Sequence, residues 1–230
     1  YTGPTALAAY EVDPVTAGLT ALAGSPWSLT GDAAQVDGPS PLALDPLGRF
    51  LYVGGNKSSF IEAFYIDPAS GMLTAVPGTP FALNGVPYDV EVHPSGDFLY
   101  VLNEWDEVDA FSIDSATGAL QTINGSPFPL GPACFDIGIH PDGGELLSAH
   151  FYSDVEVDAI DPISGAMTFL GSVWRDGVSR PKTLVMDPLG EYVYVRDVDM
   201  GVYVLERNLF SGDWQQTNAS PFWAEFNDGL

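Results

Sequence analysis

Polar side chains that could bind or transform a ligand gather in a few short stretches of this chain. The stretches hold residues that exchange protons or carry charge, and the candidate ligand-binding members are Asp106, His150, Tyr152, Asp154 and Arg196. Glu104 and Arg180 lie in similar stretches and add a carboxylate and a guanidinium. Such a set offers hydrogen bonds and charge to a polar ligand. The alternative is a set of surface ion pairs, each of which contributes little energy.

Two other features contain residue types that can bind a metal ion. The acidic run at residues 104–109 could bind calcium through its oxygens, but it lacks the spaced Asp/Asn and Gly pattern of known calcium loops. His93 and His140 occupy positions where the sister stretches carry Asp45 and Asp187, so we expect turn residues and not metal ligands. We therefore expect no cofactor, with calcium as the alternative.

The net charge limits the possible partners. Thirty-one acidic and seven basic residues give a net charge of −24, which repels phosphate backbones and removes the counterion release that drives nucleic-acid binding. No apolar run reaches the roughly 18 residues that a membrane span requires. Nucleic acid and membrane insertion are therefore not expected. Such a charge is typical of an extracellular or cell-surface protein, or alternatively of the cytoplasm of a halophile.

The same charge predicts that stability depends on salt. The acidic groups repel one another and added cations screen that repulsion, so the melting temperature should rise from low to molar NaCl. A flat or falling curve would mean that the acids are already balanced. An EDTA titration would then test for bound calcium.

The elements that carry these residues repeat along the chain. One type of turn begins with Asp or Asn, at Asp13, Asp67, Asp114, Asp161 and Asn208, and the last four are each 47 residues apart. A second type of turn contains Pro and ends in Gly, and it begins at Asp45, His93, His140 and Asp187. In both types the first side chain can accept a backbone hydrogen bond and the Gly supplies a positive φ. Two turn types with one period indicate a repeat architecture.

Short strands rich in aromatic and β-branched residues lie between the turns, for example at 50–53, 98–101 and 192–195. Each unit holds four of them, and four antiparallel strands per roughly 40–50 residues form one blade of a β-propeller. The sequence therefore predicts an all-β fold, a β-propeller of four-stranded antiparallel blades in a single domain. The blade units are expected near residues 1–30, 39–84, 86–130, 132–177 and 180–226.

The first of these units is incomplete. The sequence starts at a third strand, near residues 6–12, which gives four complete blades plus a half blade and allows a ring of seven blades. An open strand edge is a template for pairing with another strand. We therefore expect another protein chain, or further copies of this one, to dock along the open blade edge.

The blade pattern also places the candidate residues. The regular turns lie on one face, whereas the connections from second to third strand and from blade to blade lie on the other. Varied loops on a rigid scaffold usually carry function. The stretches 103–107, 149–154, 175–180 and 196–199 belong to the varied face. We therefore expect the candidate residues to converge near the channel mouth.

The repeat resembles a known family. The Asp/His-Pro-x-Gly turn, the Phe-Leu-Tyr-Val strand at 98–101, the Ile-Asp-Pro-x-Ser-Gly turn at 160–165 and the Gly-Ser-Pro-Phe run at 125–128 look like those of lactonase propellers related to 6-phosphogluconolactonase and of the YVTN-repeat group. The resemblance covers nearly the whole chain. Its motifs build blades, so they specify the fold more than the function.

The resemblance implies a site in which Arg, His and Glu cluster at the channel mouth. Asn103-Glu104 matches an Asn-Glu motif of the family, and Arg180-Pro181 keeps the start of an Arg-Pro-Arg-His run but lacks its His. Glu104 could then act as a general base and Arg180 could polarise a lactone carbonyl. Because the set is incomplete, we expect a non-catalytic extracellular or cell-surface propeller that acts as a binding or assembly module. The alternative is a sugar-lactone hydrolase.

Overall fold

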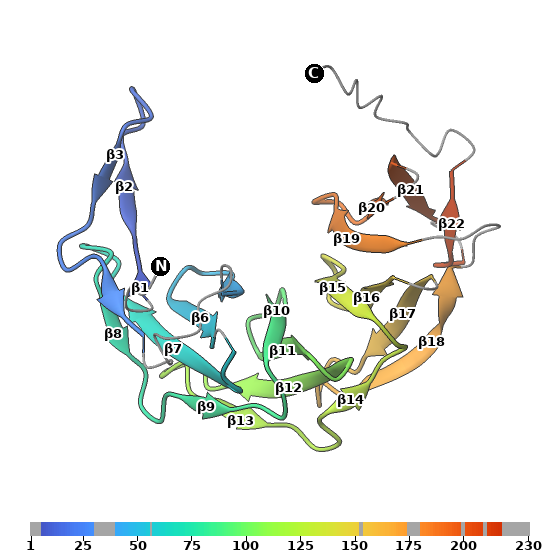
Figure 1. Ribbon diagram of the computed structural model, residues 1–230, viewed down its shortest axis with the longest axis horizontal. Helices are drawn as coiled ribbons and strands as arrows, with labels where there is room; N and C mark the ends of the chain where they lie inside the picture. The colour runs from blue at the N-terminus through green and yellow to red at the C-terminus, as the bar shows by residue number, and fades with distance from the viewer. Residues whose placement is uncertain are drawn as a thin grey trace. The chain divides into compact units, whose positions relative to one another are not determined.

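The computed structural model describes residues 6–29, 40–55, 57–151, 154–173, 180–198, 201–208 and 211–217. These residues form β-strands joined by turns, so the predicted all-β class is confirmed (Figure 1). In the described ranges there is no helix, and hence none that is long and apolar enough to cross a membrane.

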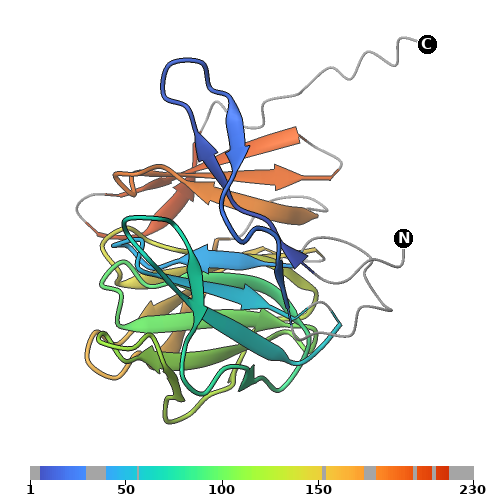
Figure 2. The same ribbon diagram turned by 90° about the vertical axis from the view of Figure 1, so that its left-hand side faces the viewer.

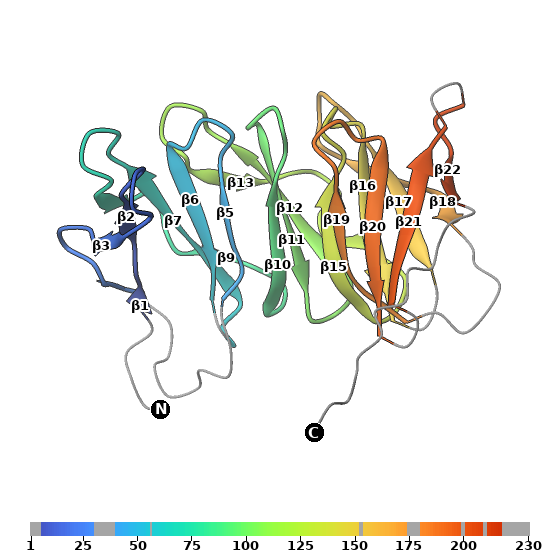
Figure 3. The same cartoon turned by 90° about the horizontal axis from the view of Figure 1, so that it is seen from above.

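Four sheets have the four-stranded antiparallel order expected of blades. Sheet I consists of β5 (Leu42–Leu44), β6 (Phe50–Gly54), β7 (Phe60–Ile66) and β8 (Leu73–Ala75), with β9 (Phe81–Ala82) also pairing with β7. Sheet II consists of β10 (Pro87–Val92), β11 (Phe98–Asn103), β12 (Glu107–Ile113) and β13 (Leu120–Thr122), with β14 (Phe128–Pro129) also pairing with β12. Sheet III consists of β15 (Cys134–Ile139), β16 (Glu145–His150), β17 (Val155–Ile160) and β18 (Met167–Val173). Sheet IV, seen in Figure 3, consists of β19 (Pro181–Met186), β20 (Tyr192–Asp197), β21 (Gly201–Arg207) and β22 (Trp214–Gln216).

The N-terminal strands form two short ladders. The strand β1 (Ala6–Leu7) pairs with β4 (Trp27–Ser28), and β2 (Tyr10–Val12) pairs with β3 (Leu19–Ala21), as Figure 2 shows for the blue hairpin. Among the described residues these strands have no other strand partner. The pairings are those of the outer part of a blade, so the expected count of four blades and a half blade is confirmed. Docking of another chain along this edge stays a prediction.

The chain divides into two compact units. Unit 1 is Tyr1–Trp105 with Asp109–Thr122, and unit 2 is Asp106–Val108 with Ile123–Leu230. Sheet I belongs to unit 1, and sheets III and IV belong to unit 2.

Each unit has its own apolar core. In unit 1, β6 and β11 are buried at every position, which explains why both carry the continuous run Phe-Leu-Tyr-Val. A strand in the middle of a sheet that is covered on both faces must be apolar at consecutive positions. In unit 2 the core includes Leu147 of β16 in sheet III and Val193 of β20 and Leu205 of β21 in sheet IV.

The repeated turns form as the sequence predicts. Oδ1 of Asp67 accepts hydrogen bonds from the backbone N–H groups of Ala69 and Ser70 (3.0 and 2.8 Å) and from the Ser70 hydroxyl (2.8 Å). The bonds from Ser70 are the largest cause of a lowered pKa at Asp67. His93 and His140 likewise accept a backbone N–H within their own turns, which confirms them as turn residues.

Candidate functional site

Two basic side chains lie over aromatic rings near the start of β19 in unit 2. The guanidinium carbon of Arg180 lies 5.5 Å from the centroid of the Phe151 ring, and Nζ of Lys182 lies 5.7 Å from the centroid of the Phe135 ring. The two ring centroids are 5.5 Å apart. Cation–π contacts of this kind hold a positive charge in a fixed place. We call these four residues the cation–aromatic cluster.

Backbone hydrogen bonds position the strand that carries the cluster. The N–H of Arg180 donates to Oδ2 of Asp197 (2.6 Å), and Pro181 lies opposite Asp197 in the ladder between β19 and β20. The N–H of Leu184 donates to Oδ2 of Asp136 in β15 (2.6 Å). This charge-assisted bond joins sheets III and IV next to the cluster. It therefore holds the aromatic residues of the cluster in place relative to its basic residues.

A third basic residue, Arg196, lies near the cluster, together with the carboxylates of Asp136 and Asp197. Lys182 and Arg196 are exposed, and Thr183 lies opposite Arg196 across the β19–β20 ladder. Among the described residues, no carboxylate pairs with Lys182 or Arg196. Two free cations near a guanidinium suit a ligand that carries a carbonyl and an anionic group.

The predicted acids Glu104 and Asp106 both bond to the backbone. Glu104 lies in unit 1, where its Oε1 accepts the N–H of Val86 (3.2 Å). Asp106 lies in unit 2, where its Oδ1 accepts the N–H of Cys134 (2.8 Å). The predicted catalytic residues Glu104 and Arg180 therefore belong to different units. Their catalytic roles stay predictions.

His150 lies inside sheet III. Its Nε2 is 2.8 Å from Oγ of Ser148 and 3.4 Å from Oε2 of Glu156, and its Nδ1 is 3.3 Å from the carbonyl oxygen of Pro132. A Ser, a His and an acid also make up the catalytic triad of serine hydrolases. In a triad, the acid contacts the ring nitrogen of the His that the Ser does not contact. Here Ser148 and Glu156 contact the same nitrogen, and Ser148 is fully buried. The network therefore does not form a nucleophile, and ligand binding by His150 stays a prediction.

The remaining candidates lie around this sheet. Oδ2 of Asp154 accepts the hydroxyl of Ser172 (3.1 Å) at an exposed position. Tyr152 and Arg175 lie outside the described residues. No group of three or more His, Cys, Asp or Glu side chains is arranged to hold a metal ion in the part of the chain that the structure describes. Calcium binding stays a prediction.

Sequence reasoning missed one titratable group. Glu91 is half-buried in β10, where burial, together with the nearby Asp89, raises its pKa to about 7. A carboxylate with such a pKa changes its protonation near neutral pH, as general bases in active sites do. The only signal in the sequence is that Glu91 stands where the sister inner strands carry Gly138 and Val185.

The chain matches a family described as "Lactonase, 7-bladed beta-propeller" over residues 6–136 and 87–224. Among solved structures it is similar to a protein of Bacteroides uniformis named as a 6-phosphogluconolactonase, with 21% identity over 93% of this chain and 64% of that chain and a TM-score of 0.75. A protein of Bacteroides fragilis with the same designation has 21% identity over 93% and 64%, with a TM-score of 0.72. The periplasmic gluconolactonase of Pseudomonas aeruginosa has 19% identity over 92% and 62%, with a TM-score of 0.71. No curated protein matches the chain.

The chain spans less than two thirds of the length of these three structures. At this level of identity, the similarity shows a shared fold and not a shared activity. Together with the four-stranded sheets, the family match confirms the predicted β-propeller fold.

Proposed function

Because the chain belongs to the lactonase family of seven-bladed β-propellers, we propose that it hydrolyses a sugar lactone. The family match overturns the expectation of a non-catalytic binding or assembly module, whereas the extracellular or cell-surface location stays a prediction. That expectation rested on the acidic charge and on the incomplete catalytic set, in which the run that begins at Arg180-Pro181 lacks its His. It gave no weight to Lys182, which stands at the next position and is held over an aromatic ring.

The observation that carries the proposal is the fixed guanidinium of Arg180 over Phe151. In lactone hydrolysis, water attacks the carbonyl carbon, the bond from that carbon to the ring oxygen breaks, and the ring oxygen takes a proton. The product is an open hydroxy acid, which releases a proton at neutral pH. The carbonyl oxygen gains negative charge in the transition state, and a guanidinium held in place beside it lowers the barrier.

Lys182 and Arg196 support an anionic substrate. Both are exposed and lack a carboxylate partner among the described residues, so they are available for a phosphate or carboxylate on the sugar. The names of two similar structures, which refer to 6-phosphogluconolactonase, agree with this chemistry. We therefore propose that phosphorylated sugar lactones are preferred over neutral ones.

The proposal is tested with purified protein, glucono-δ-lactone and its 6-phosphate. The release of acid is followed at constant pH and compared with spontaneous hydrolysis. We expect turnover above the spontaneous rate and a higher kcat/KM for the phosphorylated lactone. The absence of turnover with both substrates would reject the proposal.

Substitutions in unit 1 can identify the general base. A base acts only when it is deprotonated, so a reaction that depends on Glu91 should speed up as the pH rises through about 7. If Glu91 is the base, Glu91→Gln removes this rise in the pH–rate profile and Glu104→Gln retains it. If Glu104→Gln abolishes turnover while Glu91→Gln keeps the rise, Glu104 is the base, as the sequence predicts.

A further inference from the structure

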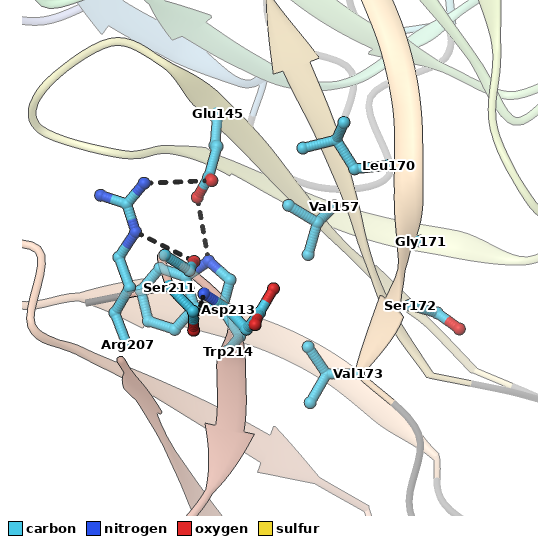
Figure 4. Close-up of a pocket in the computed structure, with 11 residues that line it drawn as sticks. Glu145, Val157, Leu170, Gly171, Ser172, Val173, Arg207, Ser211, Asp213 and Trp214 are labelled. Atoms are coloured by element: carbon cyan, nitrogen blue, oxygen red, sulfur yellow. Dashed lines mark hydrogen bonds and ion pairs between the residues drawn. The ribbon is translucent and has the colours of Figure 1, made fainter. Parts of the chain in front are cut away.

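A cavity of about 520 Å³ lies between sheets III and IV in unit 2 (Figure 4). Val157, Leu170 and Trp214 form its apolar wall, and Glu145 and Arg207 form its polar wall. Most of its lining belongs to β17, β18, β21 and β22, the outer strands of the two sheets, whereas the cation–aromatic cluster lies at the inner strands β15 and β19. Its volume is in the range of small-molecule sites.

The same place in unit 1 is a closed apolar core. The residues that line it belong to one buried cluster, and they are Phe50, Ala63, Val76, Ile113 and Leu120. Two repeats later, the same positions hold Glu145, Val157, Leu170, Arg207 and Trp214. A glutamate and an arginine thus replace Phe50 and Ile113. Because the five residues change together, a close-packed core in one unit corresponds to an amphipathic hollow in the other.

This hollow lies where sheet III lacks a turn that sheet I has. In sheet I, residues 76–80 form the turn between β8 and β9, whereas in sheet III β18 continues to Val173 through a bulge. Val76 points into the core and is 2% exposed. Its counterpart Leu170 is 60% exposed. Leu170 therefore does not fill the space between the sheets.

The charges of the cavity favour a cation. Arg207 pairs with Glu145 (3.1 Å) and Asp142 (3.0 Å), and Nε1 of Trp214 donates to Glu145 (3.0 Å). The only positive charge among the described residues of the lining is therefore neutralised. Asp213 also lines the cavity, is exposed, and has no basic partner among the described residues. An apolar wall next to a free carboxylate complements an apolar group that carries a positive charge.

We propose that this cavity binds a small amphipathic cation, an ammonium group on an apolar ring or chain. The apolar body contacts Val157, Leu170 and Trp214, and the ammonium pairs with Asp213. The preceding repeat has Ala166 at the position of Asp213. The carboxylate of Asp213 is therefore not part of the repeated blade pattern. The net charge of −24 adds a long-range attraction for cations.

Three probes with the same ring and different charge test the proposal: benzylamine, benzyl alcohol and benzoate. Each is titrated calorimetrically into the protein at pH 7. We expect protonated benzylamine to bind at one site, benzyl alcohol to bind about fivefold more weakly because it lacks the ion pair, and benzoate not to bind. Equal or tighter binding of the alcohol or of benzoate would overturn the proposal.

Substitutions then locate the site. Asp213→Asn should weaken benzylamine about fivefold, to the level of benzyl alcohol. Asp97→Asn removes an exposed carboxylate of unit 1 and should change the affinity less than twofold, about the effect of a screened distant charge. Val157→Phe fills the cavity and should abolish binding of both probes. If Asp97→Asn weakens binding as much as Asp213→Asn, or if binding survives Val157→Phe, the probes bind elsewhere and the proposal is wrong.

Discussion

Replacing Arg180 with alanine is expected to lower kcat/KM for 6-phosphogluconolactone about a hundredfold, because the substitution removes the charge that stabilises the oxyanion. Most of the loss should appear in kcat, since the interaction is stronger in the transition state than with bound substrate. Arg180→Lys should recover only part of the rate, because an ammonium lacks the planar fork of donors. Acid release above the spontaneous rate measures both variants.

Two further substitutions make this result specific. Lys182→Ala should raise KM for the phosphorylated lactone and leave the neutral lactone unchanged, because only the former carries the anion. Lys57→Ala removes a basic residue of unit 1 and serves as the charge control. Unchanged kinetics in Arg180→Ala, or an equal loss in Lys57→Ala, would contradict the role of Arg180.

Asp158→Asn is expected to stabilise the protein at pH 7 by about 2 kcal/mol more than at pH 4, where a part of the ionisation penalty is already present. Asp158 is 4% exposed, and its Oδ2 has no hydrogen-bond partner among the described residues. Burial, with a smaller contribution from Glu156, raises its pKa from 3.8 to about 6. A shift of this size corresponds to about 3 kcal/mol at about 1.4 kcal/mol per pKa unit. Denaturant unfolding of both proteins at the two pH values measures the difference.

The sign follows from proton linkage. The folded state holds the Asp158 proton more tightly than the unfolded chain, so stability from the protonated form is complete below pH 3.8 and is lost as the pH rises through about 6. The amide of the Asp158→Asn variant cannot ionise, so the variant avoids this loss of stability.

Asp161, three residues later in the chain, is the matched control. Its pKa is lowered by the bonds from Ser164, so Asp161→Asn should destabilise the protein more at pH 7 than at pH 4. Parallel pH profiles for wild type and Asp158→Asn would contradict the prediction.

The family match supports the proposed function and confirms a fold that the sequence already indicated. The blade motifs were enough to recognise lactonase propellers, but they contain few residues that could do chemistry. The partial Arg-Pro-Arg-His run therefore favoured a binding module. Lys182 and the aromatic rings beneath it were not weighed as part of a site, because Phe135 and Phe151 lie far from Lys182 in the chain. The pairing of β15 with β16 brings these rings together, and the packing of β15 against β19 places them close to the cations.

The local structure of this chain could be predicted from its sequence. An Asp such as Asp67 bonds to backbone groups two and three residues later, and apolar runs such as 98–101 identify central strands, so the period, the turns and the blade pattern could be predicted. Tertiary structure decided what each polar group does, because burial depends on residues distant in the chain. It buried His150, raised the pKa of Glu91 and Asp158, and joined Asp136 to Leu184 across 48 residues. Desolvation and packing between sheets do not follow the repeat period of the sequence, so they can be assessed only in the folded structure.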